Sequence, residues 1–389
     1  MTKLPSSELP EPGEAARIHS HHLATLIRRE IIAHEGWITF SRFMDLALYA
    51  PGLGYYSAGA AKLGGGGDFV TAPEISRLFG RTLARQVGEI LRITEGDILE
   101  VGAGSGKLAR DLLQELHALG ALPARYSILE VSADLRERQQ AIIKELAPAL
   151  AERVVWLDRL PQDFSGIILA NEVVDAMPAH LVAWRNGGLY ERGVGLADHA
   201  FVWREKALND GELYEAARTL PLQPGFVSEI NLLARRFIET VALLLRHGLL
   251  LVIDYGFPAR EYYHPQRSRG TLMCHYRHHA HADPFYFPGL QDITAHVDFT
   301  ALASAGRQAG LEVLGYSTQA EFLIQCGITD VLAQTPATQM ALYLPLSSQA
   351  QTLLSPAEMG ELFKVLIVGN GRAIDALAHL ADIDQSYRL

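Results

Sequence analysis

The feature that most constrains the fold of this chain is the segment GDILEVGAGSGKLARDLL, residues 96–113. It begins with a short apolar run, passes through three glycines at alternate positions, and continues with helical periodicity. Glycine lets the backbone turn sharply and lets a ligand approach the main chain closely. The helix that follows offers free N–H groups and a partial positive charge at its N-terminus. The segment therefore predicts a strand, a ligand-binding turn and a helix, as at the start of a nucleotide-binding α/β sheet.

Apolar strands and helices alternate after this segment. The strands are short and rich in Ile, Leu and Val, which is typical of strands that are buried on both faces. Helical patterns over 107–119 and 133–146 separate the first few of them. This alternation predicts an α/β fold with a mostly parallel sheet and right-handed crossovers. The predicted strands are 98–102, 126–131, 154–157, 166–171, 249–255, 311–317 and 363–368.

The remaining segments divide around this sheet. Residues 1–13, rich in Pro, Ser and Glu, predict a flexible tail, and 14–95 predict an N-terminal helical region with a glycine-rich lid. Residues 96–389 predict one core, so the length reflects an elaborated core and not a row of modules. The expected insertions are a β-meander at about 179–206, a long loop at 256–290 and a helical insert at 319–361.

Two further helices are expected on the way back into the sheet. One is predicted over 228–246, and the other over 294–309 with Thr294 as its N-cap. Near the N-terminus, a helix is predicted over 40–48, capped by Thr39 or Ser41, and another follows at about 75–91.

Composition excludes several classes of protein. The 389 residues include 34 basic and 44 acidic side chains, which gives a net charge of −10, and 49% of the residues are hydrophobic. This balance excludes a disordered chain, and it does not favour general binding to nucleic acid, which needs an excess of Lys and Arg. We therefore expect a globular protein whose partners do not include nucleic acid.

The cysteines and the N-terminus bear on location. Two cysteines, Cys274 and Cys326, are too few for a disulfide framework or a Cys-rich zinc site and suit a reducing compartment. The first residues lack an apolar leader and carry several acids, which favours neither a secretory nor a mitochondrial signal. Apolar runs such as 249–253 are too short to span a bilayer. We expect a cytoplasmic protein without a membrane span.

Three classes of ligand use a glycine-rich turn before a helix. A P-loop is excluded because Leu108 stands where Ser or Thr is needed, and Val101 stands where the first glycine is needed. The dinucleotide string GxGxxA fits residues 104–109, so an NADP site stays open. The ExGxGxG pattern of S-adenosylmethionine sites is filled at every fixed position, by Glu100, Gly102, Gly104 and Gly106.

An acidic residue supports a nucleotide ligand. Glu130 ends the next strand, 24 residues beyond Gly106, where a carboxylate accepts hydrogen bonds from both ribose hydroxyls. A tight turn with an incidental surface glutamate is the alternative. The pattern favours S-adenosylmethionine, and the expected cofactor-binding residues are Glu100, Gly102, Gly104, Gly106, Glu130 and Asn171.

The strand at 166–171 ends in a polar sequence, NEVVDAMP. Carboxyl ends of strands in an open parallel sheet face the ligand crevice, so Asn171, Glu172 and Asp175 are candidate catalytic residues. Carboxylates there orient a cationic nitrogen acceptor or accept its proton. The competing interpretation makes Asn171 a helix N-cap and Glu172 part of the first turn.

These strings together resemble one known family. The chain resembles the MidA-like methyltransferases, whose mitochondrial members assist respiratory complex I assembly as protein-arginine methyltransferases. The most specific strings are GDFVTAPEISRLFG at 67–80 and LANEVVDAMPAH at 169–180. The resemblance runs from about Gly36 to Gly371 and also includes 38–56, 99–113, 289–299, 318–328 and 359–366.

The resemblance implies a class I methyltransferase core, which is Rossmann-like, with S-adenosylmethionine as the methyl donor. For the mitochondrial members it implies symmetric dimethylation of an arginine in a complex I subunit. Because the start of this sequence is acidic and lacks a presequence, it is similar to a bacterial relative. Its acceptor is then another protein or a subunit of a homologous quinone reductase, and an oligomer is possible. A cofactor-binding assembly factor with little turnover is the main alternative, and an NADP-dependent oxidoreductase is a weaker one.

Other segments carry candidate substrate or lid residues. In GDFVTAPE, Asp68 and Thr71 are expected to reach the ligand, although a capped helix start explains the same residues. In the loop MCHYRHHAHAD, Tyr276 and His278 are the candidates for contact with a peptide, and ordinary structure is the alternative. No metal site is expected, because no helix holds the histidines on one face. Asp298 is expected to face the crevice.

Two further features have competing explanations. Tyr49, Tyr55 and Tyr56 either stack on an acceptor guanidinium or form a hydrophobic seam, and we favour the seam. A serine hydrolase is excluded because Ala103 and Lys107 occupy the glycine positions of a GxSxG elbow around Ser105.

Overall fold

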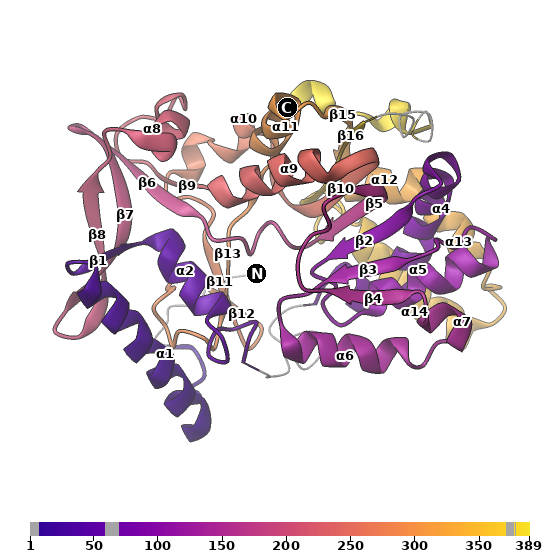
Figure 1. Cartoon of the computed structure of the whole chain (residues 1–389), viewed down its shortest axis with the longest axis horizontal. Helices are drawn as coiled ribbons and strands as arrows, with labels where there is room; N and C mark the ends of the chain where they lie inside the picture. Colours follow the sequence, from indigo (N-terminus) through magenta and orange to yellow (C-terminus); the bar gives the residue numbers. More distant parts are fainter. Residues whose placement is uncertain (1–7, 59–69, 371–376, 378) are drawn as a thin grey trace. The chain divides into compact units, whose positions relative to one another are not determined.

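The computed structural model describes residues 8–58, 70–370, 377 and 379–389 (Figure 1). The chain forms two compact units, each built from three separate segments. The accessory unit comprises Met1–Phe69, Asp175–Arg235 and Arg260–His296, and the core unit comprises Val70–Val174, Arg236–Ala259 and Val297–Leu389.

The core unit contains an eight-stranded sheet in the order β15-β16-β10-β5-β2-β3-β4, with β14 paired to β10. Strands β4, β3, β2, β5, β10 and β14 run parallel to their neighbours, whereas β16 is antiparallel to both β10 and β15. This arrangement confirms the predicted α/β fold with a mostly parallel sheet. The strands are β2 (Asp97–Val101), β3 (Tyr126–Leu129), β4 (Val154–Leu157), β5 (Phe164–Asn171), β10 (Leu245–Phe257), β14 (Val297–Asp298), β15 (Glu312–Thr318) and β16 (Phe363–Asn370).

Helices cover this sheet and close its core. The apolar faces of α4 and α5 pack together with alternate residues of β2, β5, β10 and β16 in one hydrophobic cluster. The helix α11 packs on the opposite face, where Gly306 approaches Ile238 of α9 and Val368 of β16. The core-unit helices are α3 (Ala72–Ile75), α4 (Arg77–Thr94), α5 (Lys107–Ala118), α6 (Ala133–Ile143), α7 (Pro148–Ala151), α11 (Phe299–Gln308), α12 (Gln319–Gln325), α13 (Ile328–Ala333), α14 (Met340–Leu354) and η4 (Ser386–Arg388).

The accessory unit combines two small sheets with helices. The larger has the order β1-β7-β6-β9, with β8 paired to β7, and the smaller has the order β12-β11-β13. The helix α9 (Leu232–Leu244) begins in this unit and ends in the core unit. The other elements are α1 (Glu14–Ala33), β1 (Trp37–Thr39), α2 (Phe40–Tyr49), β6 (His180–Arg185), β7 (Gly188–Ala197), β8 (Ala200–Ala207), α8 (Gly211–Arg218), β9 (Val227–Ile230), α10 (Ala259–Tyr262), η2 (Pro265–Arg267), β11 (Met273–Tyr276), β12 (His279–His281) and β13 (Asp292–Thr294).

Several local predictions are confirmed. The helix α2 begins after Thr39, whose side chain accepts a hydrogen bond from Arg42 N. The predicted meander forms strands β6, β7 and β8, and the insert at 319–361 is helical as expected. The strand β2 and the helix α5, on either side of the glycine-rich turn, also begin and end within a residue or two of the predicted bounds.

Three predictions are wrong. The stretch 228–246 is not one helix, because its first residues form β9 and pair with β6, and its last residues extend β10. The expected loop at 256–290 contains α10, β11 and β12. Thr294 does not cap a helix: it lies in β13, and α11 begins five residues later with Asp298 as its N-cap.

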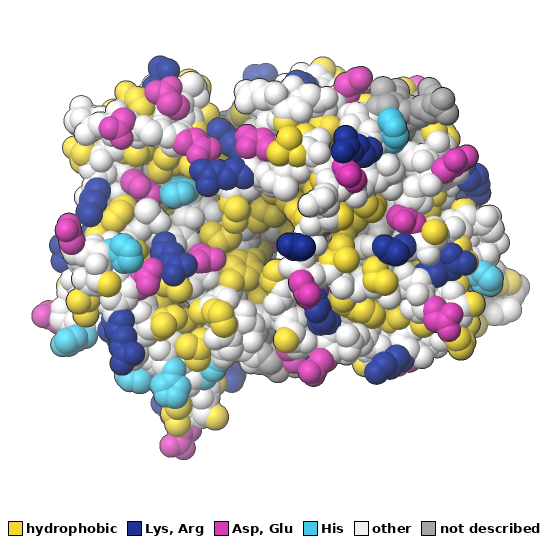
Figure 2. Space-filling model, in the orientation of Figure 1, with side chains coloured by type: hydrophobic (Ala, Val, Ile, Leu, Met, Phe, Trp, Pro, Cys, Tyr) yellow, Lys and Arg dark blue, Asp and Glu magenta, His cyan; other side chains and the backbone are white. Residues whose placement is uncertain are grey.

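Charged side chains of both signs are spread over the visible face of the molecule, between apolar patches (Figure 2). Within the described ranges, no helix combines the length and the apolar character that crossing a bilayer requires.

Candidate functional site

The glycine-rich turn lies between the end of β2 and the start of α5, as predicted. Gly102, Gly104 and Gly106 have φ values of +66°, +54° and +87°, in the left-handed region that favours glycine. A Cβ at Gly102 would lie 3.1 Å from Val173 Cγ2, and a Cβ at Gly106 would lie 3.1 Å from the Cα of Gln139. The turn therefore needs glycine both for its conformation and for its close packing against two neighbouring segments.

Glu130 lies at the end of β3 and is buried. Its Oε1 accepts a hydrogen bond from Ser132 N at 2.9 Å, and its Oε2 accepts one from Gln139 Nε2 at 2.9 Å. Burial raises the pKa of Glu130, and these hydrogen bonds oppose the rise. Each carboxylate oxygen can accept a second hydrogen bond, so Glu130 keeps the capacity to bind a hydroxyl. Its predicted role at the ribose stays a prediction.

Gln139 of α6 connects Glu130 to the glycine-rich turn. Its Nε2 also donates to Gly104 O at 2.9 Å, and its Oε1 accepts from Trp156 Nε1 at 2.9 Å. The side chain is fully buried, and these contacts fix the carbonyl of the middle glycine. Gln139 was not predicted as a site residue, because a single polar residue within an amphipathic helix belongs to no motif.

Replacing Gln139 by alanine is expected to weaken S-adenosyl-homocysteine binding roughly tenfold and to destabilise the fold by at least about 3 kcal/mol. The substitution removes the Gln139 partner of Gly104 O, of Glu130 Oε2 and of the Trp156 indole, and each unsatisfied group costs about 1–3 kcal/mol. Titration calorimetry and urea unfolding measure the two effects. The neighbouring Gln140→Ala variant, on a less buried position, serves as the control. Equal behaviour of the two variants would contradict this role of Gln139.

Glu100 is the predicted cofactor-binding acid of the motif, and its side chain lies within the core unit. It is 3% exposed, and its Oε2 accepts a hydrogen bond from Tyr126 Oη at 2.8 Å. Burial, with a smaller contribution from the charge of Glu130, raises its pKa from the usual 4.5 to about 7. The contact with Tyr126 orients Glu100, and its contact with a cofactor stays a prediction.

The raised pKa of Glu100 predicts a pH-dependent stability. Between about pH 4.5 and 7 the folded chain holds a proton that the unfolded chain loses, so stability falls as the pH rises through this window. The Glu100→Gln variant, which stays neutral, is expected to be more stable than wild type by up to about 3 kcal/mol at pH 8 and by less than about 1 kcal/mol at pH 5. Urea unfolding at both pH values measures the difference.

The control for this measurement is Glu137→Gln, which removes the same charge from an exposed position on α6. A Glu100→Gln curve that follows the control would show that Glu100 is ionised in the folded protein throughout this range.

The polar sequence after β5 forms the second part of the site. Glu172 has a φ of +52°, which is unusual for a residue with a side chain, and its N–H donates to Ile253 O at 2.8 Å. Its Oε1 accepts hydrogen bonds from Ala72 N at 3.0 Å and Asn171 Nδ2 at 3.2 Å. Such backbone strain persists only where the surroundings enforce it, and it concentrates at functional sites.

Asn171 has a buried side-chain oxygen that fits a ligand site. Among the residues that the structure describes, none donates a hydrogen bond to Asn171 Oδ1. Buried polar atoms usually have a partner, so this oxygen is suited to a donor on a bound molecule. Together with the three left-handed glycines, it makes the core unit fit a ligand with polar hydrogens, as the amino-acid end of S-adenosylmethionine has.

Asp254 of β10 holds the segment after Glu172 in place. Its Oδ2 accepts hydrogen bonds from Val173 N at 3.2 Å and Val174 N at 2.9 Å, and its side chain is fully buried. Val173 in turn is the residue that a Cβ at Gly102 would meet. The end of β5 and the glycine-rich turn are therefore packed directly together.

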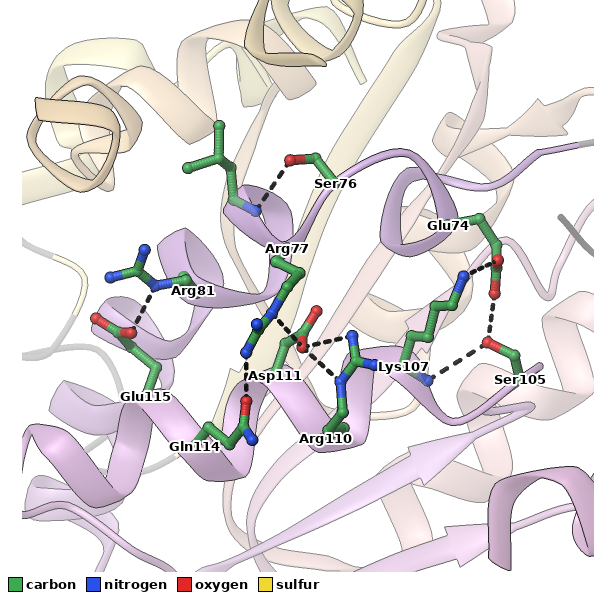
Figure 3. Close-up of polar contacts among 11 residues, drawn as sticks. Glu74, Ser76, Arg77, Arg81, Ser105, Lys107, Arg110, Asp111, Gln114 and Glu115 are labelled. Carbon is green, nitrogen blue, oxygen red and sulfur yellow. Dashed lines mark hydrogen bonds and ion pairs between the residues drawn. The ribbon is translucent and has the colours of Figure 1, made fainter. Parts of the chain in front are cut away.

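The segment TAPEI, which contains α3, contacts both parts of the site, and Figure 3 shows its contacts with the glycine-rich turn. Glu74 accepts a hydrogen bond from Ser105 Oγ in the glycine-rich turn and forms an ion pair with Lys107 Nζ. Ala72 N donates to Glu172, as described above. The capped helix start predicted for GDFVTAPE did not indicate that Glu74 contacts the glycine-rich turn.

The two predicted lid residues have different outcomes. Asp68 lies outside the described residues. Thr71 occupies the N-cap position of α3, but its side chain makes no capping hydrogen bond. Its predicted contact with a ligand stays a prediction.

Further contacts fix α4 against α5. Arg77 and Arg110 both donate to Asp111, which is buried, and Arg81 Nε contacts Glu115 Oε2 at 2.8 Å (Figure 3). These contacts fix the position of α5, the helix that follows the glycine-rich turn, relative to α4.

The remaining candidates are distributed over both units. Asp298 belongs to the core unit, and its Oδ1 caps α11 through Ala301 N at 3.0 Å. Asp175, Tyr276 and His278 belong to the accessory unit. Within the accessory unit, the carbonyl of Asp175 accepts a hydrogen bond from Ala295 N at 3.0 Å.

Tyr276 and His278 differ in their exposure. Tyr276 is 3% exposed, and its ring lies 5.5 Å from that of Tyr286, so packing accounts for most of its surface. His278 is exposed, with a φ of +64°, in the turn between β11 and β12. Of the two residues, only His278 offers most of its side chain to another molecule.

Two of the three N-terminal tyrosines stack on each other. The rings of Tyr49 and Tyr56 lie 5.6 Å apart at 19°, and their hydroxyls donate to Ala176 O at 2.9 Å and Asp292 Oδ1 at 3.0 Å. Burial, with the charge of Asp292, raises the pKa of Tyr56 well above 10. These contacts support the seam that the sequence favoured.

Comparison with known proteins places the chain in a family. Residues 82–317 match the family model described as "Putative S-adenosyl-L-methionine-dependent methyltransferase". A crystal structure from Burkholderia thailandensis with bound S-adenosyl-homocysteine is 48% identical, with a TM-score of 0.94, and covers 98% of this chain and 100% of that one.

Curated relatives include mitochondrial proteins. Protein arginine methyltransferase NDUFAF7 of Rattus norvegicus is 30% identical over 396 residues, which cover 91% of this chain and 85% of the relative. Its homologue in Drosophila melanogaster is 28% identical over 411 residues, or 94% of this chain and 89% of the relative. These matches favour S-adenosylmethionine over the NADP alternative, and the chain belongs to this family of α/β, S-adenosylmethionine-dependent methyltransferases.

Proposed function

We propose that this protein transfers a methyl group from S-adenosylmethionine to an arginine side chain of another protein. The observation that carries the proposal is the geometry of Glu172, a carboxylate held in a strained backbone beside the glycine-rich turn. A fixed carboxylate suits a cationic acceptor such as a guanidinium. The names of the mitochondrial relatives support arginine as the acceptor.

The cofactor is assigned to the core unit. We assign its amino-acid end to the turn of Gly102, Gly104 and Gly106 and to Asn171, and its ribose to Glu130. Glu100 supports the turn from within the sheet. When bound, the cofactor supplies a methyl group on a positively charged sulfur.

The polar residues after β5 are assigned to the acceptor. Glu172 would hold the guanidinium and accept the proton that the attacking nitrogen gives up as its bond to the methyl carbon forms and the bond between that carbon and the sulfur breaks, with the electron pair left on sulfur. Asn171 orients Glu172 through the hydrogen bond from its Nδ2. Asp175, the third candidate of this sequence, stays a predicted acceptor residue. Proton transfer of the kind assigned to Glu172 typically contributes about 10²–10⁴ in rate.

The acceptor protein is assigned by chemistry and by relationship. We propose an arginine-bearing subunit of an NADH-quinone reductase in the bacterial cytoplasm, because the resemblance to the MidA-like methyltransferases implies such an acceptor. The net charge of −10 favours encounter with a basic surface. Asp68, Thr71, His278 and Asp298 are the further residues that we assign to the lid and the substrate.

Labelled methyl transfer tests the proposal. Purified protein and S-adenosylmethionine with a tritiated methyl group are incubated with extract from cells that lack the protein, and mass spectrometry then locates the label. Label on arginine that is absent from the Glu172→Gln reaction supports the proposal. Label on another side chain contradicts it, and cofactor binding without any transfer favours the assembly-factor alternative.

A further inference from the structure

A groove lies on the accessory unit, apart from the residues assigned to methyl transfer. It has a volume of about 710 Å³, is open along its length, and follows one face of α1. Every residue that lines it belongs to the accessory unit. The volume falls within the range of about 300–1,000 Å³ that is usual for ligand sites.

One wall of the groove is a single face of α1. Arg17, His21, Ala24 and Arg28 recur at intervals of three and four residues, so they lie in one row along the helix. Because a helix rises 1.5 Å per residue, Arg17 and Arg28 are about 16 Å apart along its axis. Ala24, between them, is small and leaves room at the middle of the groove.

The other wall is aromatic and already packed. Phe201 of β8 and Phe285 have ring centroids 6.0 Å apart, and Phe285 also meets Phe43 of α2 edge to face at 5.3 Å. Ser20 of α1 donates to Pro288 O at 2.9 Å, which fixes this wall to the helix. The groove is therefore built before anything binds in it.

Positive charge marks both ends of the row. Arg28 Nε donates to His199 O at 2.9 Å, and its guanidinium lies 5.3 Å from the centre of the Phe201 ring. Among the described residues, no carboxylate forms an ion pair with Arg28. Arg17 has only an exposed contact of 3.4 Å with Glu11, which contributes little to stability.

We propose that this groove docks an apolar segment of a partner protein that carries an acidic residue for Arg28. Aromatic and apolar side chains line the middle together with Asp283, whose Oδ1 accepts a hydrogen bond from Phe285 N at 3.0 Å. The guanidinium groups of Arg17 and Arg28 flank the groove, which complements a peptide with apolar anchors and acidic flanks. A fatty acid carries one anionic group, and its chain is best bound in an enclosed cavity. A peptide can carry two acidic residues, so it fits an open groove with a cationic group at each end better than a fatty acid does. The inference does not rest on the proposed methyl transfer.

Selection from a phage library of random twelve-residue peptides tests the proposal on the full-length protein. Enriched peptides are then synthesised with a fluorescent label and titrated by polarisation. We expect apolar peptides with Asp or Glu, whose Kd rises at least tenfold in Arg28→Glu and in Ala24→Phe. Arg29→Glu is the matched control, since it reverses the same charge on the next, exposed residue, and its Kd should stay within about twofold.

Three outcomes would overturn the proposal. The selection yields no peptide, or the enriched peptides bind Arg28→Glu as tightly as wild type. Alternatively, sodium dodecanoate competes with every enriched peptide, which assigns the groove to a lipid. The binding experiments contain no methyl donor, so a negative result does not bear on the proposed transferase activity. In the same way, a protein without transferase activity could still bind peptides in the groove.

Discussion

Replacing Gly106 by valine is expected to reduce the affinity for S-adenosyl-homocysteine more than about 100-fold, which corresponds to roughly 3 kcal/mol. Gly106 has a φ of +87°, and an added Cβ would lie 3.1 Å from the Cα and 3.3 Å from the Cβ of Gln139. A β-branched side chain adds about 1–3 kcal/mol of backbone strain there and moves the turn away from its binding conformation. Titration calorimetry on the folded variant measures the affinity.

The matched control is Gly120→Val. Gly120 also has a positive φ, +64°, but no atom lies within 4 Å of the position of its Cβ. Both variants lose stability from backbone strain, and only the change at Gly106 should remove binding. If the two variants keep the same affinity, the turn does not hold the cofactor.

Replacing Glu172 by glutamine is expected to lower the rate of methyl transfer at least about 100-fold while the affinity for S-adenosyl-homocysteine stays within about threefold. The amide keeps an oxygen that accepts hydrogen bonds from Ala72 N and Asn171 Nδ2. It loses the negative charge and the capacity to accept a proton at neutral pH. Label transfer to the acceptor, followed over time at saturating cofactor, measures the rate.

Glu137→Gln removes the same charge from an exposed site and should transfer methyl groups at the wild-type rate. Asp254→Asn gives a second comparison, because the carboxylate of Asp254 accepts hydrogen bonds from the backbone N–H groups of Val173, Val174 and Tyr255. It should lower both the affinity and the rate. An unchanged rate in Glu172→Gln would remove Glu172 from the chemistry and leave it a structural residue.

The sequence was sufficient to predict the parts of the site whose conformation depends on residues that are close together along the chain. The strand, the three glycines and α5 lie within eighteen consecutive positions, so their spacing carries the conformation. The alternation of strands and helices likewise predicted the mostly parallel sheet. Each of these features is local, and local patterns survive in most tertiary contexts.

Contacts between distant segments were not predictable in the same way. Gln139, Glu74 and Asp254 contact the site from segments that are 31 to 81 positions away in the chain. Glu74 lies in the GDFVTAPE string and Asp254 in a predicted strand, but neither pattern indicates which residues the side chain contacts. The segment 228–230 has helical neighbours, yet pairing with β6 makes it a strand. For such residues the partner, and not the local sequence, decides the conformation.

The order in which the segments of each unit leave the ribosome has a consequence for synthesis. All three segments of the accessory unit are present once His296 has been translated, whereas the core unit still lacks its last 93 residues, 297–389. Until 363–370 emerges, one edge of β10 has no antiparallel neighbour, and a bare apolar strand edge favours aggregation. A nascent chain stalled before residue 363 is therefore the species that chaperones are expected to hold.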